Sequence, residues 1–411
     1  MKIFMEKSGP LHGEIEAGGS KNSALPIMAA SLLCTEKCNI YDIPALTDTD
    51  NMKRIMRRLG CRIEGHSFDS AGLCRYDAPY EEVKKLRGSF LLAAPLLARL
   101  GHAKIPLPGG CPIGTRPIDL HLKGLRALGA EVNAEHGVVN IDCKRLRGAR
   151  IYLDFPSVGA TENLIMAAAL AEGETLIENS AAEPEIVDLC EFLNKQGAKI
   201  SGFGSGTIRV EGVNSLHGVS HRIIPDRIEA GTYLTAFAIT HGRGRVKNVR
   251  PEHQKPLVAK LAEMGARLYE DGEDIVIDAD TELSAASIKT LPYPGFPTDM
   301  QAQFTALLSV TEGTGMVVET VFENRFLHIG ELLRMGADIK IDGRTSVIEG
   351  VDRLTGAKVE AFDLRGGAAL ALAGLVADGE TEISGAEHIA RGYENFCEKL
   401  AGTGARIAFK D

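Results

Sequence analysis

The stretch Met264-Gly265-Ala266-Arg267-Leu268 places a glycine between an apolar and a small residue, with a second apolar residue two positions later. With small variations the pattern occurs six times in the 411 residues, and successive glycines lie 69, 68, 68, 71 and 68 positions apart. A near-constant period of this kind indicates a chain built from structural repeats. The six copies are Leu59-Gly60-Cys61-Arg62-Ile63, Leu128-Gly129-Ala130-Glu131-Val132, Gln196-Gly197-Ala198-Lys199-Ile200, Met264-Gly265-Ala266-Arg267-Leu268, Met335-Gly336-Ala337-Asp338-Ile339 and Thr403-Gly404-Ala405-Arg406-Ile407.

Each repeat has the same inner order, which the third copy illustrates. The sequence predicts an alanine- and leucine-rich helix over 159–170, a glycine turn, and a short strand over 175–179. A second helix over 184–195 has apolar residues at helical spacing and stops just before Gly197, as helices often stop at glycine. Two strands joined by a turn close the repeat. The sequence therefore predicts an α+β module of the form strand–helix–strand–helix–strand–strand.

The composition excludes several classes of protein. The 46 Lys and Arg residues against 55 Asp and Glu give a net charge of -9, which argues against bulk binding to nucleic acid or acidic membranes. No apolar run is long enough for a membrane span or a signal peptide, so we expect a cytoplasmic protein of two or three domains. The eight cysteines are scattered. Cys34 and Cys38 lack a second pair at zinc-site spacing, so we expect buried thiols, with neither a disulfide nor a metal.

The first helix of a repeat is apolar nearly all round, which predicts that it is buried. Polar residues gather at the N-terminal ends of these helices, and several are cations, which the helix dipole disfavours there. Cations in that place imply an anion opposite, bound by free N–H groups. We therefore expect two globules whose inner helices direct their N-termini at a shared cleft, the alternative being simple helix capping. The residues concerned are Lys21, Asn22, Arg87, Ser157, Arg227, Glu229, Asp299, Asp363 and Arg365.

One cysteine lies in the loop Pro108-Gly109-Gly110-Cys111-Pro112-Ile113-Gly114-Thr115-Arg116-Pro117-Ile118-Asp119. A nearby cation lowers the pKa of a thiol from about 8.5 and makes it usable in acid–base or nucleophilic chemistry. The alternative is a surface cysteine without a role. Residues 116–119 also read as a helix start with Pro117 in its first position. Residues 18–22, 296–300 and 391–394 similarly read either as site segments or as ordinary turns and helix starts.

Together these segments resemble the enolpyruvyl transferase family, and within it the UDP-N-acetylglucosamine 1-carboxyvinyltransferases. The resemblance covers nearly the whole chain, and its most specific parts are the Cys111 loop and Pro297–Phe304. It implies two inside-out α/β barrel domains, each of three βαβαββ repeats, with the active site in the cleft between them. One domain would comprise residues 21–225 and the other residues 1–20 with 226–411. The further matching segments are 21–26, 157–161, 183–188, 322–326, 363–365 and 391–394.

The resemblance implies transfer of the enolpyruvyl group of phosphoenolpyruvate to the 3-hydroxyl of UDP-N-acetylglucosamine, the first committed step of peptidoglycan synthesis. In the family Cys111 is the general acid and can form a covalent adduct, and Asp299 is the base. Lys21, Arg116 and Arg391 neutralise phosphoenolpyruvate. The resemblance implies no cofactor and no obligate protein partner. The matching substrate-binding positions are Lys21, Asn22, Arg87, Arg116, Pro117, Ile118, Asp119, Leu120, Ser157, Val158, Asp299, Val321, Asp363, Arg365 and Arg391.

The sequence leaves some of the substrate contacts and some alternative functions open. Phe155-Pro156 stands where some members have Lys-Val, so a lysine contact with the nucleotide phosphates does not carry over. Glycines on both sides of Cys111 predict a lid that closes over substrate. The alternatives are transfer to shikimate 3-phosphate, a catalytically silent paralogue that senses the sugar nucleotide, and a repeat-built scaffold. The Cys111 loop and Asn324-Arg325-Phe326 favour the sugar-nucleotide enzyme.

Overall fold

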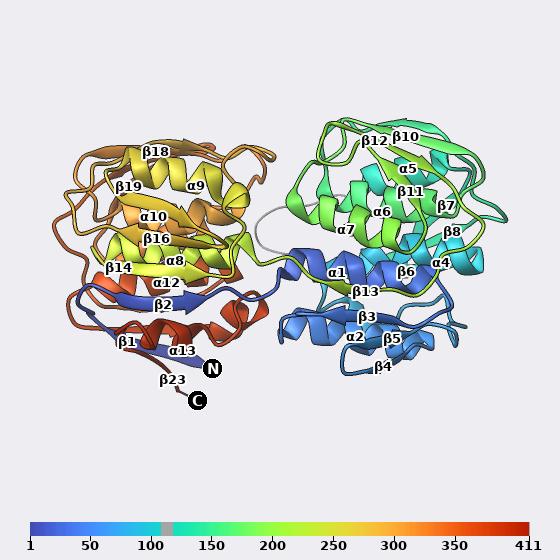
Figure 1. Cartoon of the computed structure of the whole chain (residues 1–411). Coiled ribbons are helices and arrows are strands. Elements are labelled where there is room, and N and C mark those ends of the chain that lie inside the picture. The colour runs from blue at the N-terminus through green and yellow to red at the C-terminus, as the bar shows by residue number, and fades with distance from the viewer. Residues whose placement is uncertain (108–117, 411) are drawn as a thin grey trace. The chain divides into compact units, whose positions relative to one another are not determined.

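A computed structural model describes residues 1–107 and 118–410, so Cys111, Arg116 and Pro117 lie outside the described residues. The described chain divides into two compact units (Figure 1). Unit 1 consists of residues 1–18 and 225–410, and unit 2 of residues 19–107 and 118–224. None of the described helices combines the length and the apolar composition that crossing a membrane requires.

The third repeat has the predicted order. Strand β10 pairs in parallel with β9 and antiparallel with β12, and β12 also pairs antiparallel with β11. The second helix spans the predicted residues, because its apolar face is buried and Pro184 begins it. The elements are β9 (Arg150–Tyr152), α6 (Val158–Ala169), β10 (Glu174–Glu178), α7 (Pro184–Lys195), β11 (Lys199–Ser201) and β12 (Thr207–Glu211).

The remaining elements repeat this plan. In the described part of the chain the strands form five four-stranded sheets and one three-stranded sheet, β6-β8-β7. In unit 2 the other elements are α1 (Lys21–Ala30), η1 (Ser31–Leu33), β3 (Cys38–Tyr41), α2 (Thr47–Leu59), β4 (Arg62–Glu64), β5 (Ser67–Asp69), α3 (Tyr80–Val83), η2 (Arg87–Leu92), α4 (Ala93–Leu100), β6 (His102–Pro106), α5 (Asp119–Ala127), β7 (Glu131–Glu135), β8 (Val138–Asp142) and β13 (Ser220–Arg222).

Unit 1 contains both ends of the chain, and β1 lies between β22 and β23 in its last sheet. Its elements are β1 (Lys2–Glu6), β2 (His12–Glu16), α8 (Arg227–Ile239), β14 (Arg243–Lys247), α9 (Pro251–Glu263), β15 (Arg267–Asp271), β16 (Asp274–Asp278), β17 (Ile288–Lys289), η3 (Thr298–Met300), α10 (Gln301–Leu308), β18 (Thr314–Val318), α11 (Leu327–Arg334), β19 (Asp338–Asp342), β20 (Thr345–Glu349), β21 (Lys358–Glu360), α12 (Leu364–Val376), β22 (Glu380–Ser384), η4 (Ala386–Arg391), α13 (Phe396–Ala401) and β23 (Ile407–Lys410).

The two units exchange a strand. Along the chain β2 precedes α1, yet it pairs in parallel with β14, the strand after α8. Conversely β13 precedes α8 but pairs in parallel with β3, the strand after α1. The segment before α1, the first helix of unit 2, thus supplies strand β2 to unit 1. The segment before α8, the first helix after unit 2, supplies strand β13 to unit 2.

The repeated glycines end the outer helices. All six have positive φ, with values of 113, 96, 99, 111, 91 and 98° in chain order. A residue with a side chain is strained in this conformation, so glycine is the residue that lets each helix turn into the next strand. The sequence period is thus the period of helix C-termini.

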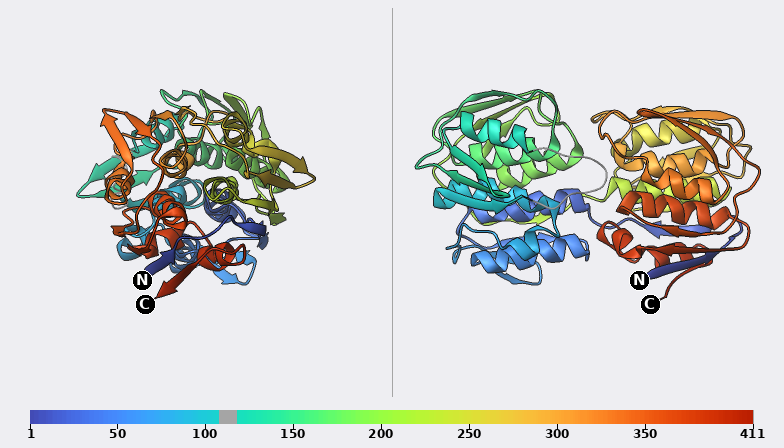
Figure 2. Two further views of the ribbon diagram at one scale, coloured as in Figure 1. Left: turned by 90° about the vertical axis from the view of Figure 1, so that its left-hand side faces the viewer. Right: turned by 180° about the vertical axis from the view of Figure 1, so that it is seen from behind.

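The inner helices α1, α4, α6, α8, α10 and α12 are enclosed by the strands and outer helices of their own unit, as two further views show (Figure 2). In α12 every residue from Arg365 to Leu375 is buried. Each unit has its own apolar core. This arrangement leaves the helix ends as the places where polar side chains meet, and it confirms the predicted inside-out repeat fold.

Two segments were read either as site segments or as helix starts. Pro117 lies outside the described residues, and the described helix α5 begins at Asp119 after Ile118. In 296–300, the short helix η3 begins at Thr298, which makes no side-chain capping hydrogen bond and donates its hydroxyl to the Glu319 carboxylate at 2.8 Å.

Candidate active site

The inner helices of unit 1 begin at acidic residues. Asp226 caps α8 by accepting hydrogen bonds from the Ile228 and Glu229 amides, at 2.8 and 3.0 Å. Asp363 caps α12 through the Arg365 and Gly366 amides, at 2.9 and 3.0 Å. Asp363 therefore has a structural role at the predicted site. Helix α10 instead follows the short helix η3, which carries Asp299.

Asp299 lies between two arginine side chains. Arg325 Nη2 donates to Oδ1 at 2.7 Å, and Arg365 donates to Oδ2 from Nη2 at 3.1 Å and from Nε at 3.3 Å. Both guanidinium groups are buried. These hydrogen bonds fix the Asp299 carboxylate in place.

The charge and the hydrogen bonding of the buried Arg365 also indicate a functional role. Burial alone would lower the pKa of this guanidinium, but Tyr393, Asp299 and Asp226 outweigh it and raise the pKa, so Arg365 stays charged. Its Nη1 is buried and has no acceptor among the described residues. A buried N–H donor without a partner is rare in proteins and calls for an explanation. An anionic ligand would supply the acceptor.

Glu319 connects the turn of Asp299 to the segment of Val321. This buried carboxylate accepts hydrogen bonds from the hydroxyls of Thr290 and Thr298, both at 2.8 Å. It also accepts from the Val321 amide at 2.8 Å. Arg325 Nη1 donates to the same Thr298 hydroxyl at 2.8 Å. Glu319 and Arg325 thus position Asp299 and bring it to Val321.

A buried polar cluster adjoins Arg365. The Tyr393 hydroxyl is 3.0 Å from Thr232 Oγ1 on α8, and Gln303 Nε2 on α10 donates to both at 3.1 Å. The Arg365 guanidinium lies over the Tyr393 ring, 5.2 Å from its centre. A Cβ atom built on Gly392 would lie 3.6 Å from Arg365 Nη1, so the segment that follows Arg391 packs against Arg365.

In unit 2, Lys21 is the first residue of α1. Ser20 caps this helix by accepting from the Ser23 amide at 3.3 Å. Lys21 is buried, and its Nζ is 3.4 Å from the buried Asp48 carboxylate. A buried amine needs such a partner to keep its charge. Asn22 follows in the same first turn, half-buried. The predicted Lys21 therefore lies at a helix N-terminus and is paired with Asp48.

The other predicted residues of unit 2 also lie at helix starts. Arg87 begins η2, beside α1, since a Cβ on Gly88 would meet Leu25 at 3.1 Å. Ser157 caps α6 through the Ala160 amide at 3.4 Å. A Cβ on Gly159 would meet His121 at 3.2 Å, which places the start of α5 against the start of α6. Ile118, Asp119 and Leu120 thereby lie near Ser157 and Val158, and Phe155 is exposed.

Two histidines, the half-buried His121 and the buried His328, support these helix starts as neutral groups. Burial lowers the pKa of His121 in unit 2 to about 4. Its Nδ1 is 2.9 Å from Asn163 Nδ2, and Asn163 also accepts from the Ala94 amide of α4. In unit 1, burial lowers the pKa of His328 to about 4, with Asp363 opposing and Arg325 reinforcing the effect.

Glu162 on α6 is a buried acid. Burial raises its pKa well above the ordinary value, and Glu185 and Glu183 reinforce the effect. Its surroundings therefore favour the protonated form of Glu162, which can donate a hydrogen bond. It lies five positions after Ser157 and was missed in the sequence, because it falls inside a largely apolar helix.

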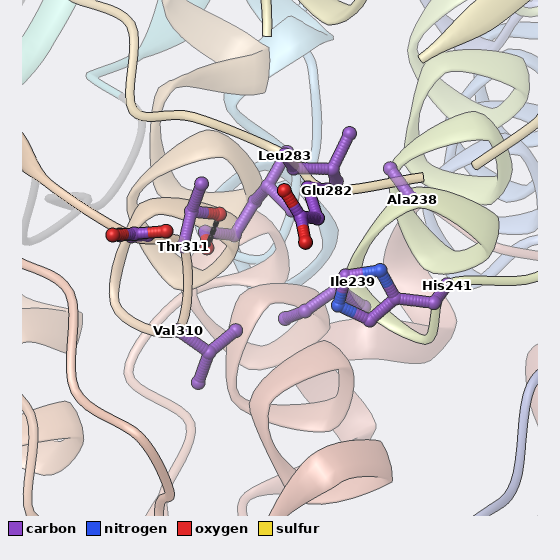
Figure 3. A pocket seen from close by; sticks show the side chains of 9 residues that line it. Ala238, Ile239, His241, Glu282, Leu283, Val310 and Thr311 are labelled. Carbon is purple, nitrogen blue, oxygen red and sulfur yellow. Dashed lines mark hydrogen bonds between the residues drawn. The ribbon is translucent and has the colours of Figure 1, made fainter. Parts of the chain in front are cut away.

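One pocket lined by described residues of unit 1 lies elsewhere. Its volume is about 200 Å³, and it lies at the C-terminal ends of α8 and α10 (Figure 3). Asp299 lies at the opposite end of α10. Among the described residues, none of those predicted for the site lines this pocket, whose walls include Ile239, His241, Glu282, Leu283 and Thr311.

Comparison with known proteins supplies the family. Residues 5–400 match the model of EPSP synthase (3-phosphoshikimate 1-carboxyvinyltransferase). The chain belongs to this family of enolpyruvyl transferases. The UDP-N-acetylglucosamine 1-carboxyvinyltransferase 1 of Caldanaerobacter subterraneus subsp. tengcongensis is 53% identical over 409 residues, 99% of each chain. The UDP-N-acetylglucosamine 1-carboxyvinyltransferase of Synechocystis sp. is 52% identical, covering 98% of this chain and 94% of its own.

Solved structures agree on the fold of this transferase. The enolpyruvyl transferase NikO from Streptomyces tendae matches with a TM-score of 0.89 and 24% identity, over 99% of this chain and 98% of its own. An EPSP synthase from Acinetobacter baumannii matches with a TM-score of 0.78 and 20% identity over the full length of both chains. Both confirm the predicted enolpyruvyl transferase fold.

The geometry of the transferase separates the predicted residues into groups. Unit 1 brings Asp299, Val321, Asp363 and Arg365 together, with the segment of Arg391 beside them. Unit 2 places Ile118, Asp119 and Leu120 beside Ser157 and Val158, and Arg87 beside the helix that Lys21 and Asn22 begin. Sequence reasoning assigned no role to Arg325, although its segment was singled out, and it missed Glu319 and Glu162.

Proposed function

We propose that this transferase moves the enolpyruvyl group of phosphoenolpyruvate to the 3-hydroxyl of UDP-N-acetylglucosamine and releases phosphate, the first committed step of peptidoglycan synthesis. The observation that carries the proposal is 53% identity over 99% of the chain to proteins named for this activity. The EPSP synthase structure, by contrast, is only 20% identical. Both proposed substrates are metabolites of the cytoplasm, which is where we expect the enzyme.

The substrates are anions, and the proposed binding residues are cations and helix N-termini. Phosphoenolpyruvate has a carboxylate and a phosphate, which Lys21, Arg116 and Arg391 would neutralise. The buried Arg365 Nη1 has no acceptor among the described residues and suits an anionic oxygen. Helix starts such as those at Ser20 and Ser157 offer backbone N–H groups to phosphate oxygens. The remaining proposed contacts with the nucleotide sugar are those of Asn22, Arg87, Pro117, Ile118, Asp119, Leu120, Val158, Val321 and Asp363.

The proposed chemistry is an addition followed by an elimination. Cys111 donates a proton to the methylene carbon of phosphoenolpyruvate, which leaves an oxocarbenium-like centre at the neighbouring carbon. The sugar 3-oxygen attacks that centre, and Asp299 takes the proton of the hydroxyl. The tetrahedral intermediate then returns a methyl proton to the Cys111 thiolate and loses phosphate, which restores the double bond and the thiol. Because Arg325 and Arg365 hold Asp299 in advance, its position needs no reorganisation during attack.

Phosphate release on mixing the two substrates tests the proposal. We expect release only with both substrates present, and loss of most of it in Cys111→Ala and Asp299→Asn. Cys111→Asp should retain activity, since a carboxylic acid also donates a proton, and should resist the thiol-alkylating epoxide fosfomycin. Release with shikimate 3-phosphate in place of the sugar nucleotide would contradict the assignment, and no release with either acceptor would favour a silent paralogue.

A further inference from the structure

Cys34 and Cys38 form a close pair of thiols in unit 2. Cys34 follows η1, Cys38 begins β3, and the exposed turn of residues 35–37 joins them. The two side chains are 1% and 0% exposed, and their sulfur atoms are only 3.5 Å apart. The sequence predicted buried thiols, and the structure confirms them, but no sequence pattern indicated a role for the pair.

One side chain contacts both sulfurs. Gln196 Nε2, at the C-terminal end of α7, is 3.3 Å from Cys34 Sγ and 3.4 Å from Cys38 Sγ. The hydrogen bond from the Cys34 thiol lowers the pKa of Cys38 to about 7 against the effect of burial, and Val219 and Gln196 add to it. The pKa of Cys34 is raised. One thiol of the pair therefore ionises readily while the other keeps its proton.

The remaining buried thiols behave differently. Burial raises the pKa of Cys61 to about 12 and that of Cys397 to about 12. Burial also raises the pKa of Cys190. Buried thiols of this kind are normally inert, since the thiolate is the nucleophile. The close sulfur contact and the shared amide donor distinguish Cys34 and Cys38 from them.

Hydrogen bonds hold the backbone around the pair. Arg99 Nη1 donates to the carbonyls of Leu32 and Cys34, both at 2.7 Å. The Ser70 hydroxyl donates to the carbonyl of Cys34. The exposed turn of residues 35–37 is held as well, since the Glu36 carboxylate accepts from the Gly218 amide at 2.9 Å. A small molecule therefore reaches the sulfurs only through local opening of this turn.

We propose that Cys34 and Cys38 are a reversible redox pair that a hydroperoxide converts into a disulfide. With hydrogen peroxide, the Cys38 sulfur attacks one oxygen, the O–O bond breaks, and a sulfenic acid and water result. The Cys34 sulfur then attacks the Cys38 sulfur, forming the S–S bond and releasing a second water. Two thiols lose two electrons and one peroxide gains them. This inference does not depend on the proposed transferase activity.

The disulfide has a defined effect on its surroundings. The sulfur atoms must approach from 3.5 Å to about 2.05 Å, the length of an S–S bond. Gln196 then loses the thiolate acceptor of its amide. Its Oε1 already has no partner among the described residues. Oxidation therefore loosens the contact between the end of α7 and the end of η1, and a dithiol reductant restores it.

Trypsin offers a direct test, because it cleaves after Lys37, between the two cysteines. The reduced protein gives separate peptides of residues 22–37 and 38–53, and the oxidised protein gives them joined by the disulfide. The folded full chain is treated with hydrogen peroxide, quenched, unfolded, alkylated and digested. We expect the joined peptides after peroxide and the separate ones after dithiothreitol.

Other cysteines of the same unit serve as controls. The peptide of residues 151–195 carries the buried Cys190, and that of residues 63–75 carries the exposed Cys74. We expect the pair to oxidise about tenfold faster than Cys190, because the thiolate is the form that reacts and Cys38 ionises more readily than Cys190. In Cys34→Ser, the sulfenic acid of Cys38 should persist and react with dimedone. If Cys74 is oxidised while residues 22–37 and 38–53 remain separate, the pair is structural and the proposal fails. It also fails if the two peptides join only in the unfolded protein.

Discussion

Glu319 fixes the turn that carries Asp299, and replacing it tests how much that turn matters. In Glu319→Gln an amide N–H₂ would face donors such as the hydroxyls of Thr290 and Thr298, which now donate to the carboxylate. We expect kcat to fall about tenfold to hundredfold with little change in KM, since a displaced base costs rate rather than binding. Steady-state phosphate release measures both constants. Glu312→Gln, at an exposed position of the same unit, is the control and should behave as the parent. An unchanged kcat in Glu319→Gln would show that Asp299 is held without it.

Glu162 gives a prediction with a defined pH dependence. Its pKa is raised in the folded protein by burial, so the unfolded chain releases this proton at lower pH than the folded chain does. Folding stability is therefore lost as pH rises above the ordinary glutamate value, about 4.3. Glu162→Gln removes that loss of stability, because glutamine does not ionise, and it keeps a side chain of similar size that can form hydrogen bonds.

The expected result is a melting temperature that exceeds the parent's by about 2 °C or more at pH 8, with little difference near pH 4.5. Thermal unfolding at the two pH values measures it. Glu172→Gln, at an exposed position of the same unit, should change neither value. A gain of equal size at both pH values would mean that packing, not ionisation, explains it.

Among single residues, the sequence identified those that begin the helices of the site. It did not identify the residues that hold these helix starts in place. Asp299, Asp363 and Arg365 belong to short motifs at helix starts, so a single sequence exposes them. Glu319 matters because residues 290, 298, 321 and 322 fold back onto one carboxylate, and no local pattern encodes that. Arg325 is similar, since its partners lie 26 and 27 positions away.

The outer helices end at glycines whose conformation can be tested by exchange for alanine. Gly404 has φ +98°, and no atom lies within 4 Å of a Cβ built on it, so the cost of a side chain there is purely conformational. We expect Gly404→Ala to lower the free energy of unfolding by about 1–2 kcal/mol. Gly330 lies inside α11, also with open space, and there alanine should add about 0.5–1 kcal/mol. Denaturant unfolding of both variants gives the two signs. A neutral Gly404→Ala would show that the turn adopts another conformation.

The period of the glycines predicted the elements well, but it could not predict how strands are shared. Each repeat needs a parallel first strand, and β2 and β13 are short strands that precede comparable inner helices. The sequence pattern of a strand fixes which face is buried, not which of two similar sheets it joins. The repeat pattern therefore could not predict the exchange of β2 and β13. Only the resemblance to the family implied that the N-terminal residues belong to the other domain.

Across the whole molecule, the described chain passes from one unit to the other at residues 18–19 and 224–225. Each crossing is held to its own unit by a buried carboxylate. In unit 1, Glu229 accepts from the Gly18 amide at 2.7 Å, and Lys399 Nζ lies 2.6 Å from the same carboxylate. In unit 2, Asp188 accepts from the Ile224 amide at 3.3 Å and from His221 Nε2 at 2.8 Å. The two crossings thus have matching anchors on elements that are unrelated in sequence.

This arrangement predicts a reciprocal pattern of hydrogen exchange. Glu229→Gln should speed exchange of the Gly18 amide, and Asp188→Asn that of the Ile224 amide, each by about tenfold, because a lost bond to a charged acceptor removes about 1.5–3 kcal/mol. Each variant should leave the amide of the other crossing unchanged, so each is the control for the other. Amide exchange measured by NMR on the full chain resolves both positions. If either substitution accelerates both amides equally, the carboxylates support the overall stability of the fold rather than anchoring one crossing each. If neither does, the two crossings are held by their backbone bonds alone, from the Ser20 amide to the Ile224 carbonyl at 2.7 Å and from the Asp226 amide to the Gly18 carbonyl at 2.8 Å.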